Sequence, residues 1–215
     1  MKNLLKKEFL LSMHPTVPMF LLLSAMLLIP NYPYYIVFFY TALAVFFTCL
    51  GGRENNDVFY TLMLPVAKKD IVRARFLFVV LFEAAQVVFA IPFAVIRQKM
   101  PISGNAVGMD ANIALFGFSL AMLGIFNFIF FRIYYSDVTK VGKAFGLASV
   151  WISIYMVAAE VCAHAVPFVR DRLDTKDPQF LGEKLAVLAA GLAVFAILTL
   201  TAYRKSVRTF ESFDL

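Results

Sequence analysis

The chain has 215 residues, of which 61% are hydrophobic, and its mean hydropathy is +0.79. This composition excludes an ordinary soluble domain and indicates a protein that crosses a membrane several times. The formal net charge is +6; in a membrane chain this reflects basic residues beside anionic lipid, so we expect no nucleic-acid partner.

The first segment, residues 1–13, mixes Leu and Phe with three Lys, and Leu5, Phe9 and Ser12 align on one helical face. This pattern predicts an amphipathic helix at the membrane interface; the alternative is the frayed start of the first span. Six apolar runs follow: residues 17–29, 34–50, 71–96, 111–131, 144–166 and 185–203. Each predicts a transmembrane helix, although the run 17–29 is short for a hydrocarbon core of about 30 Å.

The predicted fold is therefore an all-α polytopic membrane protein with six transmembrane helices. No repeat of 20 to 50 residues is visible, and we expect a single domain over residues 1–215. Fourteen of the 20 Lys and Arg lie in the segments on the same side as the N-terminus. By the positive-inside rule, both termini and the loop between the second and third spans face the cytoplasm.

That loop, residues 51–71, is much longer than a simple connection requires. Asn56 or Asp57 can cap a short helix, since either offers a side-chain oxygen to a free N–H. Val58, Leu62 and Met63 are then expected on one face, and the helix is expected to end at Leu64, before Pro65. The loop predicts a short helix outside the bilayer, between two spans. The alternative is a membrane-surface helix without a partner.

The loop also carries an acid, an aromatic residue and then Leu-x-Leu-Pro-x-x-Lys-Lys-Asp-Ile, a pattern that resembles the first cytoplasmic loop of ABC-2-type transporter permeases. The resemblance extends to the six-span layout and is strongest to short bacterial permeases that pair with a separate ATPase. Ala67 departs from it, because a Ser or Thr is expected there as a helix cap. The matching residues are Asp57, Tyr60, Leu62, Leu64, Pro65, Lys68, Asp70, Ile71 and Arg73.

The resemblance implies a permease subunit of an ATP-driven exporter in the bacterial cytoplasmic membrane. It implies a second permease subunit, expected to be identical, and two ATPase subunits that bind ATP and Mg, while this chain binds no cofactor. The short helix would be the coupling helix that docks on the ATPase. The expected ATPase-coupling residues are Arg53, Glu54, Asp57, Val58, Tyr60, Leu62, Leu64, Pro65, Lys68 and Asp70.

The cargo that the resemblance implies is a hydrophobic or amphipathic peptide, as in permeases that export phenol-soluble modulins or confer resistance to antimicrobial peptides. A lipid-like molecule is the second choice. No Walker A pattern is present, so we expect ATP hydrolysis in a partner and no enzyme activity in this chain. Neither the two Cys nor the two His form a cluster, so we expect no catalytic or metal site.

Three polar residues within the apolar runs, Glu83, Gln86 and Glu160, are candidates for the translocation path, because ionisable groups in a membrane are costly. The alternatives are a helix–helix hydrogen bond from Glu83 to Gln86 or Asn127, and an interfacial position for Glu160. Two other functions stay open: an ion-coupled secondary transporter using Glu83 and Glu160, and a non-transporting sensor or assembly protein.

Two patterns concern packing. Gly142, Gly146 and Ala148 lie along one helix and predict a close helix contact at the start of the fifth span. The grouped phenylalanines are expected mostly to contact lipid. They are Phe126, Phe128, Phe130 and Phe131.

Overall fold

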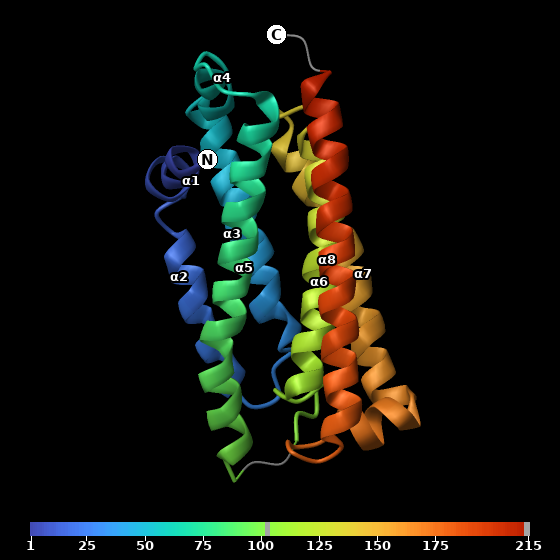
Figure 1. The fold of residues 1–215 in the computed structure, drawn as a ribbon. Coiled ribbons are helices and arrows are strands. Elements are labelled where there is room, and N and C mark those ends of the chain that lie inside the picture. Colours follow the sequence, from blue (N-terminus) through green and yellow to red (C-terminus); the bar gives the residue numbers. More distant parts are fainter. Residues whose placement is uncertain (102–103, 213–215) are drawn as a thin grey trace.

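The protein is an elongated bundle of helices (Figure 1). The computed structural model describes residues 1–101 and 104–212, and within these ranges it contains helices and connections but no strand. The helices are α1 (Lys2–Lys7), α2 (Val17–Leu22), α3 (Tyr35–Glu54), α4 (Asp57–Leu62), α5 (Lys68–Lys99), α6 (Ile113–Tyr134), α7 (Val141–Ala165) and α8 (Leu181–Glu211). Two π-helical turns, Glu8–Ser12 and Val169–Leu173, and a 3-10 helix, Leu23–Leu28, complete the described elements.

Five of these helices, α3, α5, α6, α7 and α8, are long and apolar enough to cross a membrane. The sixth candidate is the pair Lys2–Ser12 and Val17–Leu28, which meet at a bend of 83° and form either a broken span or a re-entrant loop. The prediction of an all-α polytopic membrane protein is therefore confirmed. The predicted first span is helical from Val17 to Leu28, as α2 and its 3-10 continuation, but its crossing of the membrane stays a prediction.

Several helices extend beyond the predicted spans. α5 begins at Lys68 and ends at Lys99, and α8 continues to Glu211, beyond the predicted end of the last span at residue 203. The physical reason is that Lys and Arg are good helix formers and let a helix continue beyond the apolar layer.

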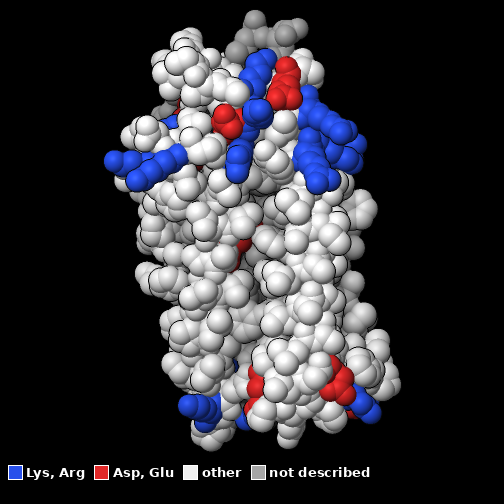
Figure 2. Space-filling view, in the orientation of Figure 1, with Lys and Arg blue, Asp and Glu red and all other residues white. Residues whose placement is uncertain are grey.

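Charged side chains gather at the two ends of the bundle. In Figure 1, α1, α4 and the end of α8 lie together at the top, which we call the α4 end; the opposite end is the far end. Figure 2 shows Lys, Arg, Asp and Glu in a band at each end and an almost uncharged surface between them. This distribution is what a hydrocarbon layer around the middle of the bundle requires, because an exposed charge there is expensive.

α6 and α8 form the closest helix pair, and glycines make that contact possible. A Cβ at Gly191 of α8 would overlap the backbone carbonyl of Gly117 of α6, and one at Gly124 would lie 2.8 Å from the Cα of Phe195. Small residues at a helix crossing allow this approach of two backbones. By contrast, nothing lies within 4 Å of a Cβ at Gly142 or Gly146, so the predicted close contact at those glycines is wrong within this chain.

Three of the grouped phenylalanines of α6 are buried rather than lipid-facing. Phe126, Phe130 and Phe131 have no exposed surface, and the ring of Phe131 lies 4.4 Å from that of Phe76 on α5. The lipid-contact prediction is wrong for these three residues because α6 lies inside the bundle, where neighbouring helices cover most of its circumference. On α3, Phe46 stacks on Phe145 of α7 at 4.3 Å between ring centroids.

Replacing Gly191 by Ala should destabilise the protein by about 1–3 kcal/mol, since the added methyl must push α6 and α8 apart. The matched control is Gly146→Ala on α7, where the site is open and the substitution should be neutral or stabilising by about 0.4–1 kcal/mol. Thermal unfolding of both variants in mild detergent measures the difference. Equal midpoints for the two variants would contradict the close α6–α8 contact.

Candidate functional site

The helix α4 stands at one end of the bundle, between the end of α3 and the start of α5 (Figure 1). Asn56 precedes it in the left-handed conformation, with φ 51°, and reverses the chain after α3. The predicted cap is wrong, because the Asn56 side chain makes no capping hydrogen bond. Pro65 follows the helix as expected, and α5 begins at Lys68 after the uncapped Ala67.

Beneath α4 lies a buried cluster of charged groups centred on Arg75 of α5. The Arg75 side chain is 4% exposed; its Nε lies 2.5 Å from Oε2 of Glu8, and its Nη2 lies 2.9 Å from Oδ2 of Asp57. Lys7 adds a second cation, with its Nζ 2.8 Å from Oδ1 of Asp57. The Ser12 hydroxyl donates to Asp57 at 3.2 Å. We call Lys7, Glu8, Asp57 and Arg75 the ion cluster.

The ion cluster ties three parts of the chain together. Lys7 and Glu8 come from the N-terminal helix, Asp57 from the first turn of α4, and Arg75 from the second turn of α5. It holds two formal positive and two formal negative charges, so it is electrically balanced. Burying such groups is costly unless each is paired, and removing one member leaves an uncompensated charge. The relative positions of the three segments are therefore strongly constrained.

The outward surface of α4 is apolar and aromatic. Tyr60 is 64% exposed, Met63 79% and Leu64 53%, while Val58 faces the bundle. Beside them, a cavity of about 410 Å³ separates the N-terminal helix from the start of α5, with Leu4, Lys7, Leu64, Pro65 and Asp70 among its lining residues. Exposed large apolar side chains of this kind indicate a surface that contacts either another protein or the membrane interface.

Polar residues in the middle of the bundle are paired with one another. Asn127 of α6 donates to Oε2 of Glu83 at 3.0 Å and to the hydroxyl of Thr199 on α8 at 3.2 Å. Gln86 donates to Ser24 at 2.8 Å. The predicted hydrogen bond between Glu83 and Asn127 is present, whereas Gln86 bonds elsewhere. Glu83 has no exposed surface, and its Oε1 has no partner among the described residues.

At the far end, side chains from several elements hold the loop that precedes α6. Glu160 of α7 accepts the N–H of Met109 at 3.0 Å, and Asp174 accepts the N–H of Asp110 at 2.7 Å. A Cβ at Gly108 would overlap the Glu160 carboxylate, so only glycine permits this approach. Arg97 donates to the Tyr34 hydroxyl at 2.8 Å from beneath the loop.

A family model described as ABC-2 family transporter protein matches residues 3–211. The chain belongs to the ABC-2 transporter family. The family that the loop resembles is thus confirmed. As an ABC-2 protein, this chain is the membrane subunit of an ABC transporter. No curated protein and no solved structure matched the chain.

The expected ATPase-coupling residues of this ABC-2 protein separate into an outward and an inward set. Arg53 and Glu54 are exposed and pair with each other at 3.6 Å, and Asp57 is turned inward into the ion cluster. The other exposed members are Tyr60, Leu64 and Pro65, the buried member is Val58, and the half-buried members are Leu62, Lys68 and Asp70. The coupling role itself stays a prediction for all ten.

Sequence reasoning missed Glu8 and Arg75 as site residues. Glu8 was one charge of an amphipathic segment, and Arg75 was one of several basic residues near the α4 end. The available signal was the position of Arg75 four residues after Ile71 and four before Val79, all three of which are buried on one side of α5. In the described part of the chain, no group of three or more His, Cys, Asp or Glu side chains is arranged to hold a metal ion.

Replacing Arg75 by Met should cost about 3–5 kcal/mol of stability, because Glu8 and Asp57 then lose their buried partner. Arg73→Met is the matched control: it removes the same charge from an exposed position on the same helix and should change stability by less than about 0.5 kcal/mol. Denaturant unfolding in detergent measures both. Similar losses in the two variants would refute the ion cluster as the main constraint at this end.

Stability at the far end should fall as the pH rises. Burial raises the pKa of the Asp110 and Asp174 carboxyls, against the opposing charge of Arg97 near Asp110. The folded protein therefore binds these protons more tightly than the unfolded chain, so the stabilisation is full below the ordinary pKa of about 4 and is lost as the pH passes the raised values. Hydrogen exchange at Met109 and Asp110, corrected for intrinsic rates, measures this dependence.

Asp174→Asn should flatten that pH dependence, since Asn keeps a side-chain oxygen for the N–H of Asp110 but does not titrate. Asp171→Asn is the control, because Asp171 is exposed on the neighbouring turn and the pKa of its carboxyl is lowered by Arg170. An unchanged slope in Asp174→Asn would show that this buried carboxyl does not set the pH response.

Proposed function

We propose that this chain is the permease subunit of an ATP-driven exporter and that the exposed face of α4 docks on a separate ATPase. The observation that carries the proposal is the position of α4. It lies at one of the two charged ends of the bundle, exposes Tyr60, is followed by the exposed Met63 and Leu64, and is tied by Asp57 to the buried Arg75. In an ABC-2 protein, a surface of this kind at the end of the spans suits a partner that supplies the energy of ATP.

The ion cluster supports a mechanical coupling between that surface and the spans. A displacement of α4 moves Asp57, and through Arg75 it acts on α5, which runs the whole length of the bundle. Through Glu8 it acts also on the N-terminal helix, which leads into the first span. Closure of the ATPase against Tyr60 and Met63 would thus move spans on both sides of α3.

We propose further that the α4 end faces the cytoplasm of a bacterium, so that both termini are cytoplasmic. Its support is the excess of Lys and Arg assigned to that side of the membrane, since positively charged loops stay on the cytoplasmic side. Two copies of the permease, forming a homodimer, would enclose the path, and two ATPase subunits would hold ATP and Mg.

A hydrophobic or amphipathic peptide is the proposed cargo. The connections at the far end are short, so no large domain is available there to recognise a soluble substrate. The Glu83–Asn127–Thr199 group is the only polar contact between α5, α6 and α8 in the middle of the described bundle, and it is the proposed polar part of the path. Glu160, which holds the far-end loop, would lie where that path ends.

The test is purification of the tagged protein from its native membrane in mild detergent, with identification of the proteins that accompany it. We expect a stoichiometric ATPase, and we expect Tyr60→Ala and Met63→Ala each to lower its recovery about tenfold or more, as for central residues of an interface. Met19→Ala is the matched control, because Met19 is 63% exposed on α2, away from α4. It should leave the recovery unchanged.

Recovery of the intact protein without an ATPase, or equal recovery in all three variants, would refute the proposed docking. The result would then favour an ion-coupled carrier. That function predicts transport that depends on pH and is abolished by Glu83→Gln. If the ATPase is recovered and Glu83→Gln still exports normally, docking stands and Glu83 is removed from the path.

A further inference from the structure

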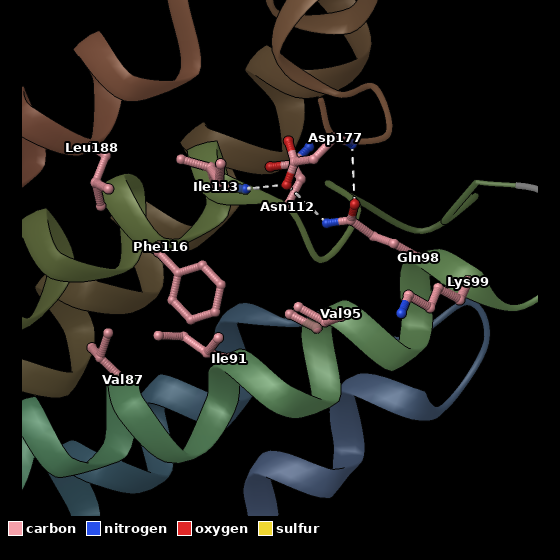
Figure 3. Close-up of a pocket in the computed structure, with 11 residues that line it drawn as sticks. Val87, Ile91, Val95, Gln98, Lys99, Asn112, Ile113, Phe116, Asp177 and Leu188 are labelled. Carbon is pink, nitrogen blue, oxygen red and sulfur yellow. Dashed lines mark hydrogen bonds between the residues drawn. The ribbon is translucent and has the colours of Figure 1, made fainter. Parts of the chain in front are cut away.

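A cavity of about 580 Å³ lies between α5, α6 and the start of α8 in the far-end half of the bundle (Figure 3). Its walls are apolar and come from three helices: Val87, Ile91 and Val95 of α5, Phe116 of α6, and Leu188 of α8. Figure 3 shows polar side chains only at one end of it, where α5 finishes and α6 begins. The cavity is thus an apolar slot with one polar mouth.

The length of this slot fits one leaflet of a bilayer. Along α5 it is lined by Val87, Ile91, Val95 and Lys99, which are spaced four residues apart on one face. From Val87 to Lys99 the helix rises about 18 Å, and half of a hydrocarbon core measures about 15 Å. Ile91 is 47% exposed and Val95 46%, so the slot opens sideways to the surroundings of the bundle. It therefore has the length and the side opening that a lipid acyl chain needs.

Most polar groups at the mouth are already satisfied within the protein. Asp177 accepts from Lys184 at 2.8 Å, from Gln98 at 2.9 Å and from the N–H of Ile113 at 3.2 Å. The Gln98 oxygen accepts the N–H of Asp177 at 3.0 Å. A small polar ligand would have to break these bonds, whereas an apolar chain would leave them intact.

The charge left over at the mouth is that of Lys99. Asp177 is neutralised by Lys184, whose side chain has no exposed surface. Lys99 is exposed, lines the cavity and has no ion pair among the described residues. An ammonium group at the end of an apolar slot is complementary to the phosphate of a lipid headgroup.

We propose that this cavity binds an anionic phospholipid of the leaflet at the far end, with one acyl chain in the slot and the phosphate beside Lys99. The lipid fills the space between α5 and α8, which Phe116 and Leu188 leave open. The headgroup lies outside the Gln98–Asp177–Lys184 network and does not disturb it. Phosphatidylglycerol, which carries a net negative charge, is the probe for this site, and the zwitterionic phosphatidylethanolamine is its comparison.

Native mass spectrometry of the purified protein, exchanged into equimolar phosphatidylglycerol and phosphatidylethanolamine, tests the proposal. We expect one retained phospholipid per chain, enriched in phosphatidylglycerol. Ile91→Trp should abolish retention because the indole occupies the slot, and Val95→Trp should do the same. Ile197→Trp is the matched control: Ile197 is 63% exposed on α8 and lines none of the described cavities, so retention should persist.

The headgroup contact is tested separately by Lys99→Ala. The preference for phosphatidylglycerol should fall about fivefold, the effect expected of one basic residue at a membrane surface. Arg170→Ala removes an exposed cation from the same end, where it pairs with Asp171, and should leave the preference unchanged.

Three results would overturn the proposal. The first is that the wild-type protein retains no lipid or shows no headgroup preference. The second is that Ile91→Trp and Val95→Trp fold and still retain the lipid. The third is that a peptide occupies the cavity instead. The wild-type measurement decides even if neither tryptophan variant folds.

Discussion

The burial of one guanidinium group constrains the whole α4 end of this protein. Arg75 has almost no contact with solvent, and its charge is compensated by Glu8 and Asp57, which come from two other segments. A pair of this kind contributes little net stability compared with an apolar contact, but leaving one member alone is expensive. Its main consequence is geometric. The N-terminal helix, α4 and α5 are held in one relative arrangement, because moving any one of them alone would leave a buried charge unpaired.

The far end obeys the same constraint with different chemistry. There the polar groups lie in the short connections and at the helix ends: Asp177, Lys184 and Gln98 satisfy one another, while Glu160 and Asp174 accept backbone N–H groups. Unpaired backbone and side-chain groups next to a hydrocarbon layer are costly, so the short connections fold back onto the spans. Both ends are thus organised by polar groups that bond to one another.

The sequence predicted those features that depend on local pattern. Long apolar runs identified the five long spans, and the Pro65 stretch located α4 and the start of α5 within a few residues. It did not predict which side of each helix faces inward, because a helix that is apolar all round gives no such signal. For that reason the buried position of Arg75 was not predicted, Phe126 was assigned to lipid, and the close helix contact was expected at Gly146 instead of at Gly191.

The buried side of α5 joins these separate features. Four of its polar residues, Arg75, Glu83, Gln86 and Arg97, lie on that side, and each bonds to a different part of the chain: Glu8 and Asp57, Asn127, Ser24 and Tyr34. α5 has 32 residues and is about 48 Å long. A rotation of α5 large enough to break one of these contacts must strain the others, because a helix transmits rotation along its axis. The α4 end, the polar group in the middle and the far end are therefore linked through a single helix.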